Sequence, residues 1–277
     1  MPNATNAREG LLAVVKHGGS TIGTDAAGPD STDETLAQIA KLHNAGMKVV
    51  VVHGGGNHIT NLSKALGIPT SFVEGRRFTC QRTLSAAVMA LAGGVNTELV
   101  AGLIRAGALA IGVSGVDGRI LQTTPAGQRF GAVGNVAAVN TAPIELFLNA
   151  GMVPVIAPIG IGMAGELHNI NADLAAAAIA VALRADHLLF LTDVPGVRAG
   201  GTVRQQLSIP QATELIASKE IEGGMIPKAE AAIEAAAAGI ANVRIIGNGP
   251  LAISEGIAGR TGTALLREAG AMAEATQ

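Results

Sequence analysis

The sequence VVKHGGS at residues 14–20 is followed, one helix length later, by VVVVHGGG at residues 49–56. In both stretches a short run of β-branched residues leads directly into glycines, which predicts two buried strands of a parallel sheet. Glycine has no Cβ, so its backbone can approach an anion closely. The residues after the second stretch can open a helix, whose first N–H groups also favour negative charge. The two stretches therefore predict a phosphate site at the carboxyl edge of the sheet.

The spacing of these glycines excludes the two common nucleotide-binding fingerprints. No G-x-x-x-x-G-K-[ST] and no G-x-G-x-x-G follows either strand. An ordinary P-loop or Rossmann site is therefore not expected. A dinucleotide oxidoreductase is excluded as well, because no acidic residue stands at the ribose-reading position after such a fingerprint.

Composition narrows the class of partner. The chain has 277 residues, a formal net charge of -2, one cysteine, and neither tryptophan nor tyrosine. Without a basic stripe or stacking side chains, nucleic-acid binding is not expected, and one cysteine excludes an internal disulfide framework. No Cys/His cluster has the spacing of a zinc site. A small-molecule substrate is the remaining expectation.

The distribution of apolar residues gives no reason to expect a membrane protein. The longest uninterrupted apolar run, residues 174–183, is far shorter than the roughly 20 residues that span a bilayer. The first ten residues are polar and do not resemble a secretory signal. We therefore expect no membrane partner and a cytoplasmic location.

Strand-like and helix-like segments alternate along the chain, which predicts an α/β fold: a three-layer αβα sandwich with a mostly parallel central sheet. A β-hairpin excursion is expected near residues 117–141. We expect one domain over residues 1–277, with two lobes, about 11–185 and about 186–268, that share one continuous sheet. The expected strands are residues 11–16, 49–53, 109–114, 153–158, 186–192 and 243–247. The expected helices are residues 32–45, 58–66, 83–91, 96–106, 143–150, 172–183, 210–217 and 225–238.

Two lysines stand where a purely structural lysine is unfavourable. Lys16 ends an apolar strand, where burial of an unpaired ammonium group is costly. Lys228 lies in the first turn of a helix, where a cation opposes the helix dipole. A solvated strand-end lysine is the alternative for Lys16, but the glycines that follow favour a phosphate ligand. A bound polyphosphate would explain Lys228.

Three other segments carry polar candidates. Arg76 and Arg77 offer a guanidinium fork to a carboxylate, although surface arginines are common. Helix capping and dipole compensation explain Asn171 and Asp173 but leave Asn169 available to bind a polar substrate. Asp173 could also orient lysine ammonium groups. For His53 we expect a strand-end histidine with satisfied hydrogen bonds.

Six segments, taken in order, resemble the amino acid kinase family, and most closely its acetylglutamate kinase branch. The resemblance covers about residues 11–266, and the N-x-N-A-D and G-G-M-x-x-K segments are its most specific parts. The six segments are KHGG at 16–19, HGGG at 53–56, GRRFT at 75–79, NINAD at 169–173, LTDVPGV at 191–197 and GGMIPK at 223–228.

The resemblance implies a role for each candidate residue. Lys16 and Lys228 would stabilise the transferred phosphoryl group as catalytic residues, and Asp173 would hold both lysines. The acceptor would be bound by Gly55, Gly56, Arg77 and Asn169. The ATP site would be formed by Gly18, Gly19, Gly54, Asp193, Val194, Gly196, Arg198, Gly223, Gly224 and Met225. The first lobe would bind the acceptor and the second ATP.

The reaction implied by the resemblance is phosphorylation of the γ-carboxylate of N-acetyl-L-glutamate by ATP, a step of arginine biosynthesis. A carboxylate with a pKa near about 4.3 is already ionised at neutral pH, so no general base is required. Mg²⁺ would be held mainly by the nucleotide phosphates, so no protein ligand to the metal is expected.

Two alternatives stay open. One is a carrier-protein-linked aminoadipate or glutamate kinase of lysine biosynthesis, and the other is a non-catalytic nucleotide-binding regulatory protein of the same fold. His17, where many relatives carry Tyr or Leu, and Arg76-Arg77-Phe78, in place of Leu-Arg-Val, are departures that concern the acceptor more than phosphoryl transfer. We further expect a homodimer through the apolar helix near residues 83–94, and weak or no inhibition by arginine.

Overall fold

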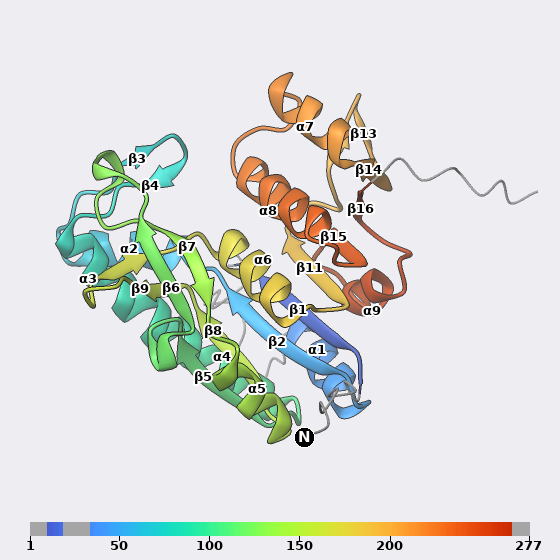
Figure 1. Cartoon of the computed structure of the whole chain (residues 1–277), viewed down its shortest axis with the longest axis horizontal. Coiled ribbons are helices and arrows are strands. Elements are labelled where there is room, and N and C mark those ends of the chain that lie inside the picture. Colours follow the sequence, from blue (N-terminus) through green and yellow to red (C-terminus); the bar gives the residue numbers. More distant parts are fainter. Residues whose placement is uncertain (1–9, 19–33, 268–277) are drawn as a thin grey trace, which may run out of the picture.

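The computed structural model describes residues 10–18 and 34–267, and its centre is an eight-stranded sheet (Figure 1). The strand order is β14-β16-β15-β11-β1-β2-β8-β5. Six neighbouring strands are parallel; β16 is antiparallel to β15, and β14 is parallel to β16. The bounds are β1 Leu12–His17, β2 Lys48–His53, β5 Ala110–Ser114, β8 Val153–Ala157, β11 His187–Thr192, β14 Gln206–Ser208, β15 Asn242–Gly247 and β16 Thr263–Leu266.

Helices cover both faces of this sheet because its strands are apolar on both sides. Successive residues of a strand point to opposite faces. Val14 and Val50 accordingly belong to one buried cluster, whereas Val15 and Val51 belong to another. The first cluster is covered by α5 (Ala142–Asn149), α6 (Ala172–Leu183), α7 (Ile209–Ala217) and α8 (Met225–Ala237). The second is covered by α1 (Glu34–Asn44), α4 (Asn96–Arg105) and α9 (Ala252–Ile257).

A second sheet confirms the excursion expected at residues 117–141. Its order is β10-β9-β6-β7, and β6 pairs antiparallel with β7 across that segment. The hairpin β9–β10 was not predicted, because strands of three residues leave little periodicity to detect. The bounds are β6 Leu121–Pro125, β7 Gly134–Val139, β9 Ile159–Ile161 and β10 Leu167–Asn169, with short 3-10 helices at Asp117–Arg119 and Gln128–Phe130.

Two short hairpins extend from the fold. One consists of β3 (Phe72–Val73) and β4 (Arg76–Arg77), and the other of β12 (Arg198–Ala199) and β13 (Thr202–Val203). Figure 1 shows β3–β4 and the α7–β13 region on opposite sides of the same end of the molecule. The carboxyl ends of the central strands lie between these two projections.

The prediction of two separate helices at 83–91 and 96–106 is wrong. A π-helix, η1 (Met89–Val95), joins α3 (Gln81–Val88) directly to α4, so that one helix runs from Gln81 to Arg105. The wider π turn carries the helical backbone through Gly93 and Gly94. Helix α2 (Gly56–Ala65) packs beside this long helix.

This long helix is, within residues 10–18 and 34–267, the one that is long and apolar enough to cross a membrane by length and composition. Core helices pass the same test, so the finding is weak evidence for a span. Leu99 and Leu103 of this helix are buried against the central sheet, as in a core helix.

The remaining strand and helix bounds agree with the structure to within a few residues. All six predicted strands are present in one continuous sheet, and residues 172–183 form α6 as predicted. The start of the helix predicted at 32–45 lies outside the described residues, and α1 is described from Glu34. The predicted fold class is confirmed.

Candidate active site

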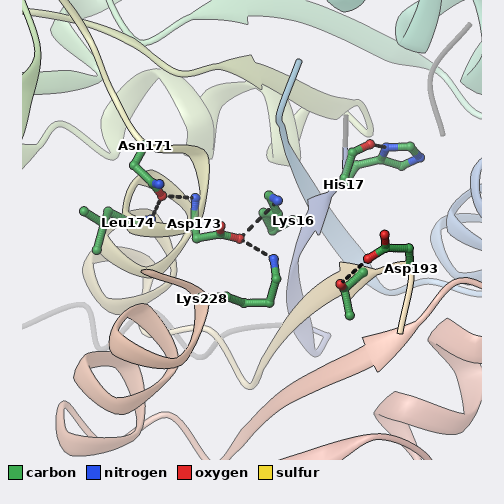
Figure 2. Close-up of polar contacts among 9 residues, drawn as sticks. Lys16, His17, Asn171, Asp173, Leu174, Asp193 and Lys228 are labelled. Atoms are coloured by element: carbon green, nitrogen blue, oxygen red, sulfur yellow. Dashed lines mark hydrogen bonds and ion pairs between the residues drawn. The ribbon is translucent and has the colours of Figure 1, made fainter. Parts of the chain in front are cut away.

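One carboxylate binds two lysines at the carboxyl edge of the sheet. Asp173 Oδ1 lies 3.1 Å from Lys16 Nζ and 2.8 Å from Lys228 Nζ. All three residues are buried. Figure 2 shows the two lysine side chains converging on Asp173, while the ring of His17 points away from it. We call Lys16, Asp173 and Lys228 the ion triad.

The ion triad joins three elements that are far apart in the chain. Lys16 is on β1, Asp173 is in the first turn of α6 and Lys228 is in the first turn of α8. Asn171 caps α6, since its Oδ1 accepts hydrogen bonds from the backbone N–H groups of Asp173 (2.8 Å) and Leu174 (3.1 Å). The capping expected for Asn171 is confirmed, and the cap fixes the backbone from which the Asp173 side chain extends.

Burial and charge set the protonation of the triad. Burial alone raises the pKa of the Asp173 carboxyl, but the ammonium charges of Lys16 and Lys228 lower that pKa overall. Burial, with the charge of Lys16 next, lowers the pKa of Lys228 to about 8, against the opposing effect of Asp173. Asp173 is therefore ionised at neutral pH, and most of Lys228 is protonated.

A cavity of about 290 Å³ opens on one side of the triad, and we call it the smaller cavity. The residues predicted to bind the acceptor, Gly55, Gly56, Arg77 and Asn169, all line it, together with Lys16 and Asp173. Gly54, predicted with the ATP site, lines this cavity instead. Its N–H donates to the carbonyl of His17 at 2.9 Å.

A hydrogen-bonded chain fixes the polar wall of the smaller cavity. Arg77 Nη2 donates to Gly56 O and to Thr60 Oγ1, both at 2.9 Å. Arg77 Nη1 is buried and has no hydrogen-bond partner among the described residues. Burial lowers the pKa of the Arg77 guanidinium, which still keeps its charge at neutral pH. Arg77 therefore presents a charged donor that an anion could satisfy.

Thr79 is a site residue that sequence analysis did not single out. It is fully buried; its Oγ1 donates to Arg77 O at 3.0 Å and accepts from Asn169 Nδ2 at 3.2 Å. Thr79 thus connects two predicted acceptor ligands that are remote in sequence. Only its position inside the GRRFT segment hinted at this function.

A second cavity, of about 450 Å³, opens on the other side of the triad, and we call it the larger cavity. All three triad residues line it. It also contains five of the residues predicted for the ATP site, namely Gly18, Asp193, Val194, Gly224 and Met225, together with Leu191 and Thr192. Thr192 Oγ1 donates to Asp193 Oδ1 at 3.0 Å (Figure 2).

Besides Gly54, four residues predicted for the ATP site do not lie on the larger cavity or are not described. Gly196 is buried beside Thr263, and Arg198 and Gly223 are exposed away from the lining. Gly19 lies outside the described residues. The structure thus brings together the core of the predicted nucleotide group but not all of it.

The prediction for His53 is confirmed. The ring is fully buried, its Nδ1 lies 2.9 Å from Gly54 O, and its Nε2 lies 3.2 Å from Asn96 Nδ2. His53 does not line either cavity. In the part of the chain that the structure describes, no group of three His, Cys, Asp or Glu side chains could hold a metal ion.

The two cavities meet at Lys16 and Asp173, which line both. An anionic group at this junction would contact two ammonium groups whose positions are fixed by one carboxylate. Fixed cations of this kind stabilise charge that is shared between a donor and an acceptor. The geometry therefore suits transfer of an anionic group from one cavity to the other.

Comparison with known proteins gives consistent results. Residues 12–247 match the model of the Amino acid kinase family. The acetylglutamate kinase of Rubrobacter xylanophilus is 42% identical over 261 residues, which cover 94% of this chain and 98% of that protein. The acetylglutamate kinase of Chlorobaculum tepidum is 42% identical over 245 residues, 86% of this chain and 83% of that protein. The crystal structure of smu.665 from Streptococcus mutans matches with a TM-score of 0.81 and 32% identity, over 93% of this chain and 99% of that one.

Proposed function

This chain belongs to the amino acid kinase family, and we propose that it phosphorylates the γ-carboxylate of N-acetyl-L-glutamate with ATP, in arginine biosynthesis. The observation that carries the proposal is the junction of the two cavities at the ion triad. One cavity offers a fixed guanidinium to an acidic acceptor, and the other offers glycines and two lysines to a polyphosphate. The names of the relatives support the choice of acceptor.

In the proposed reaction a γ-carboxylate oxygen attacks the γ-phosphorus of ATP. A new C–O–P bond forms, the bond from that phosphorus to the β,γ-bridging oxygen breaks, and ADP leaves. The carboxylate is already ionised, so no proton has to be removed. The main barrier is repulsion between two anions, and the positive charges of Lys16 and Lys228, both held by Asp173 Oδ1, lower it.

Each remaining residue has a proposed role that follows from its cavity. Arg77 binds the α-carboxylate of the acceptor through its unpartnered Nη1, and Asn169 binds the main-chain part of the acceptor. The backbone N–H groups at the start of α2, at Gly55 and Gly56, support the reacting carboxylate. The larger cavity holds ATP, with Val194 and Met225 as its aliphatic contacts.

Mg²⁺ enters with the nucleotide as part of the substrate. Asp173 is engaged by two lysines, which disfavours a metal ion at the same oxygen. Mg²⁺ commonly keeps several waters and binds substrate phosphates with few protein ligands. The phosphate oxygens of ATP are therefore the proposed ligands.

The test is to trap the acyl phosphate with hydroxylamine in the presence of ATP and Mg²⁺. We expect a hydroxamate with N-acetyl-L-glutamate and none with N-acetyl-L-aspartate. A product only with carrier-linked aminoadipate or glutamate would favour the lysine-pathway alternative. No product with any acceptor would contradict a kinase function.

We also propose a homodimer formed through the long helix, and action in the cytoplasm. Met89 is 51% exposed on this helix. A groove of about 440 Å³ lies on its outer side, lined by Gly93, Gly94, Thr97, Glu98, Ala101 and Arg105. Small residues allow two helices to approach closely, and two-fold dimers are the commonest oligomers. Light scattering should give twice the chain mass of 27.6 kDa for the wild-type protein. Ala101→Arg places a large charged side chain in the groove and should give the mass of a single chain.

A further inference from the structure

A buried side-chain relay leads from helix α4 to the first glycine of the acceptor loop. Asn96 Nδ2 lies 2.9 Å from Val155 O, 3.4 Å from Val113 O and 3.2 Å from His53 Nε2. His53 Nδ1 lies 2.9 Å from Gly54 O. Asn96 is 5% exposed and His53 is 0% exposed.

The partners in the relay decide which ring nitrogen of His53 carries the proton. Val155 O and Val113 O are carbonyl acceptors, so the Asn96 atom that faces them must be the NH₂ group. That NH₂ group also faces His53 Nε2, which must therefore be an unprotonated acceptor. Gly54 O is a carbonyl as well, so Nδ1 must carry the proton of the ring. His53 is held as the neutral Nδ1–H tautomer.

Protonation of the ring would break this arrangement. A proton on Nε2 would point at the NH₂ group of Asn96, which is itself a donor. The Asn96 amide would then lose His53 Nε2 as an acceptor. In agreement, burial lowers the pKa of His53 to about 4; the hydrogen bond with Gly54 opposes this, and the charges of His17 and His58 add to it. The ring is therefore neutral at neutral pH.

The relay holds both sides of Gly54. The Gly54 carbonyl accepts from His53, while the Gly54 N–H donates to the carbonyl of His17 on β1 at 2.9 Å. His17 directly follows Lys16. Gly54 in turn leads into Gly55 and Gly56, whose backbone lines the smaller cavity beside Lys16.

We infer that Asn96 and His53 are positioning residues, which set the orientation of the Gly54 peptide and through it the acceptor loop relative to Lys16. Only the expected effects on kcat rest on the proposed function; the tautomer of His53 does not. His53 contacts neither cavity, so it acts through Gly54 and not on a substrate. Displacement of a reacting group by about 1 Å can cost roughly 100-fold in rate.

The first test needs no activity. ¹⁵N NMR of the full chain at neutral pH, with His53 assigned from the signal lost in His53→Asn, should show Nδ1 protonated and Nε2 unprotonated. Free histidine favours the opposite tautomer. Protonation at Nε2 would overturn the inference, whatever reaction the protein catalyses.

The second test separates the two ends of the ring with a matched pair of variants. The amide of His53→Asn can place a donor where Nδ1 stands, whereas that of His53→Gln reaches only the Nε2 position. We expect His53→Asn to keep kcat within about threefold and His53→Gln to lose roughly 10- to 100-fold in kcat, with the KM for ATP nearly unchanged. Equal losses in the two variants at equal thermal stability would overturn the inference.

A remote variant tests Asn96. A Cβ at Gly112, on the edge strand β5, would collide with Asn96 Oδ1. Gly112→Ala should therefore displace the Asn96 amide and lower kcat by up to about threefold, as in His53→Asn, which also lacks the contact with Asn96, without touching a cavity residue. Wild-type kcat and an unchanged His53 NMR signal in a folded Gly112→Ala protein would contradict the role of Asn96.

Discussion

The smaller and larger cavities share two residues but are otherwise lined by different kinds of chemical group. Arg77 and Asn169 are the polar side chains of one wall of the smaller cavity, and Thr79 behind them hydrogen-bonds the Arg77 carbonyl and the Asn169 amide. The larger cavity offers glycine backbone, two lysines and aliphatic contacts. Under the proposed function, prearranged side chains bind the acceptor, whereas charge and backbone groups hold the nucleotide. Substitutions on the two sides should therefore affect different kinetic constants.

The largest effect is expected at the shared junction. Lys16→Met removes one of the two cations that face the transferred group and leaves Asp173 with Lys228 alone. We expect kcat to fall by about 1000-fold, measured as ADP release. Lys48→Met is the matched control, since Lys48 lies on the adjacent strand and contacts Asn149 instead. If Lys16→Met retained a tenth of the wild-type kcat, Lys16 would not be a catalytic residue of this reaction.

Arg77 should affect the acceptor alone. Hydrogen bonds to charged groups contribute about 1.5–3 kcal/mol, so Arg77→Met should raise the KM for the acceptor roughly 10- to 150-fold. The KM for ATP should stay within about twofold. Arg76→Met is the control: both guanidinium groups line the cavity and lie over a ring, that of Arg76 over Phe130 at 5.5 Å and that of Arg77 over Phe72 at 5.0 Å, but Arg77 is the one hydrogen-bonded to Gly56 and Thr60. Equal effects of the two variants would refute the role of Arg77 in binding a carboxylate.

The nucleotide side should show a pH dependence that the acceptor side lacks. Lys228 has a pKa of about 8, so its ammonium is charged below that pH and is lost above it. We expect kcat/KM for ATP to decline above about pH 8, approaching tenfold per pH unit. Lys228→Arg should remove the decline up to pH 10, because an arginine keeps its charge. A decline that persists in Lys228→Arg must arise from another group.

The smallest effects concern two helix caps, one near the triad and one remote from it. Asn171→Ala and Ser208→Ala each remove an N-cap, at α6 and at α7, and should lower the free energy of unfolding by about 1 kcal/mol. Urea denaturation measures both losses. Only Asn171→Ala should also reduce kcat, because Asn171 holds the backbone of Asp173. An equal reduction of kcat in both variants would contradict a specific effect of the Asn171 cap on Asp173.

The fold was predictable where the evidence in the sequence is local. β-branched runs located the six parallel strands, and Asn171 revealed the cap of α6. The long helix was not predictable, because Gly93 and Gly94 weaken an α-helix and nothing local indicates a π turn. Strands β14 and β16 have three and four residues, too few for a period of two to be recognised.

The site was predictable as residue types but not as contacts. Lys16 and Lys228 were identified because each is unfavourable for the fold alone, and their convergence on Asp173 explains both. The link from Asn169 to Thr79 spans 90 residues, and that from Asn96 to His53 spans 43. Such links depend on how the sheets pack, which no single segment encodes.

The charge of the ion triad has a consequence for what it prefers to hold. Two ammonium groups and one carboxylate leave a surplus of a single positive charge in a buried place. A phosphoryl group midway between donor and acceptor resembles metaphosphate, which carries about one negative charge. In the proposed reaction this surplus charge lies beside the oxygens over which the charge of the transferred group is spread. The triad would therefore hold a charge opposite in sign and similar in size to that of the group while it moves between donor and acceptor.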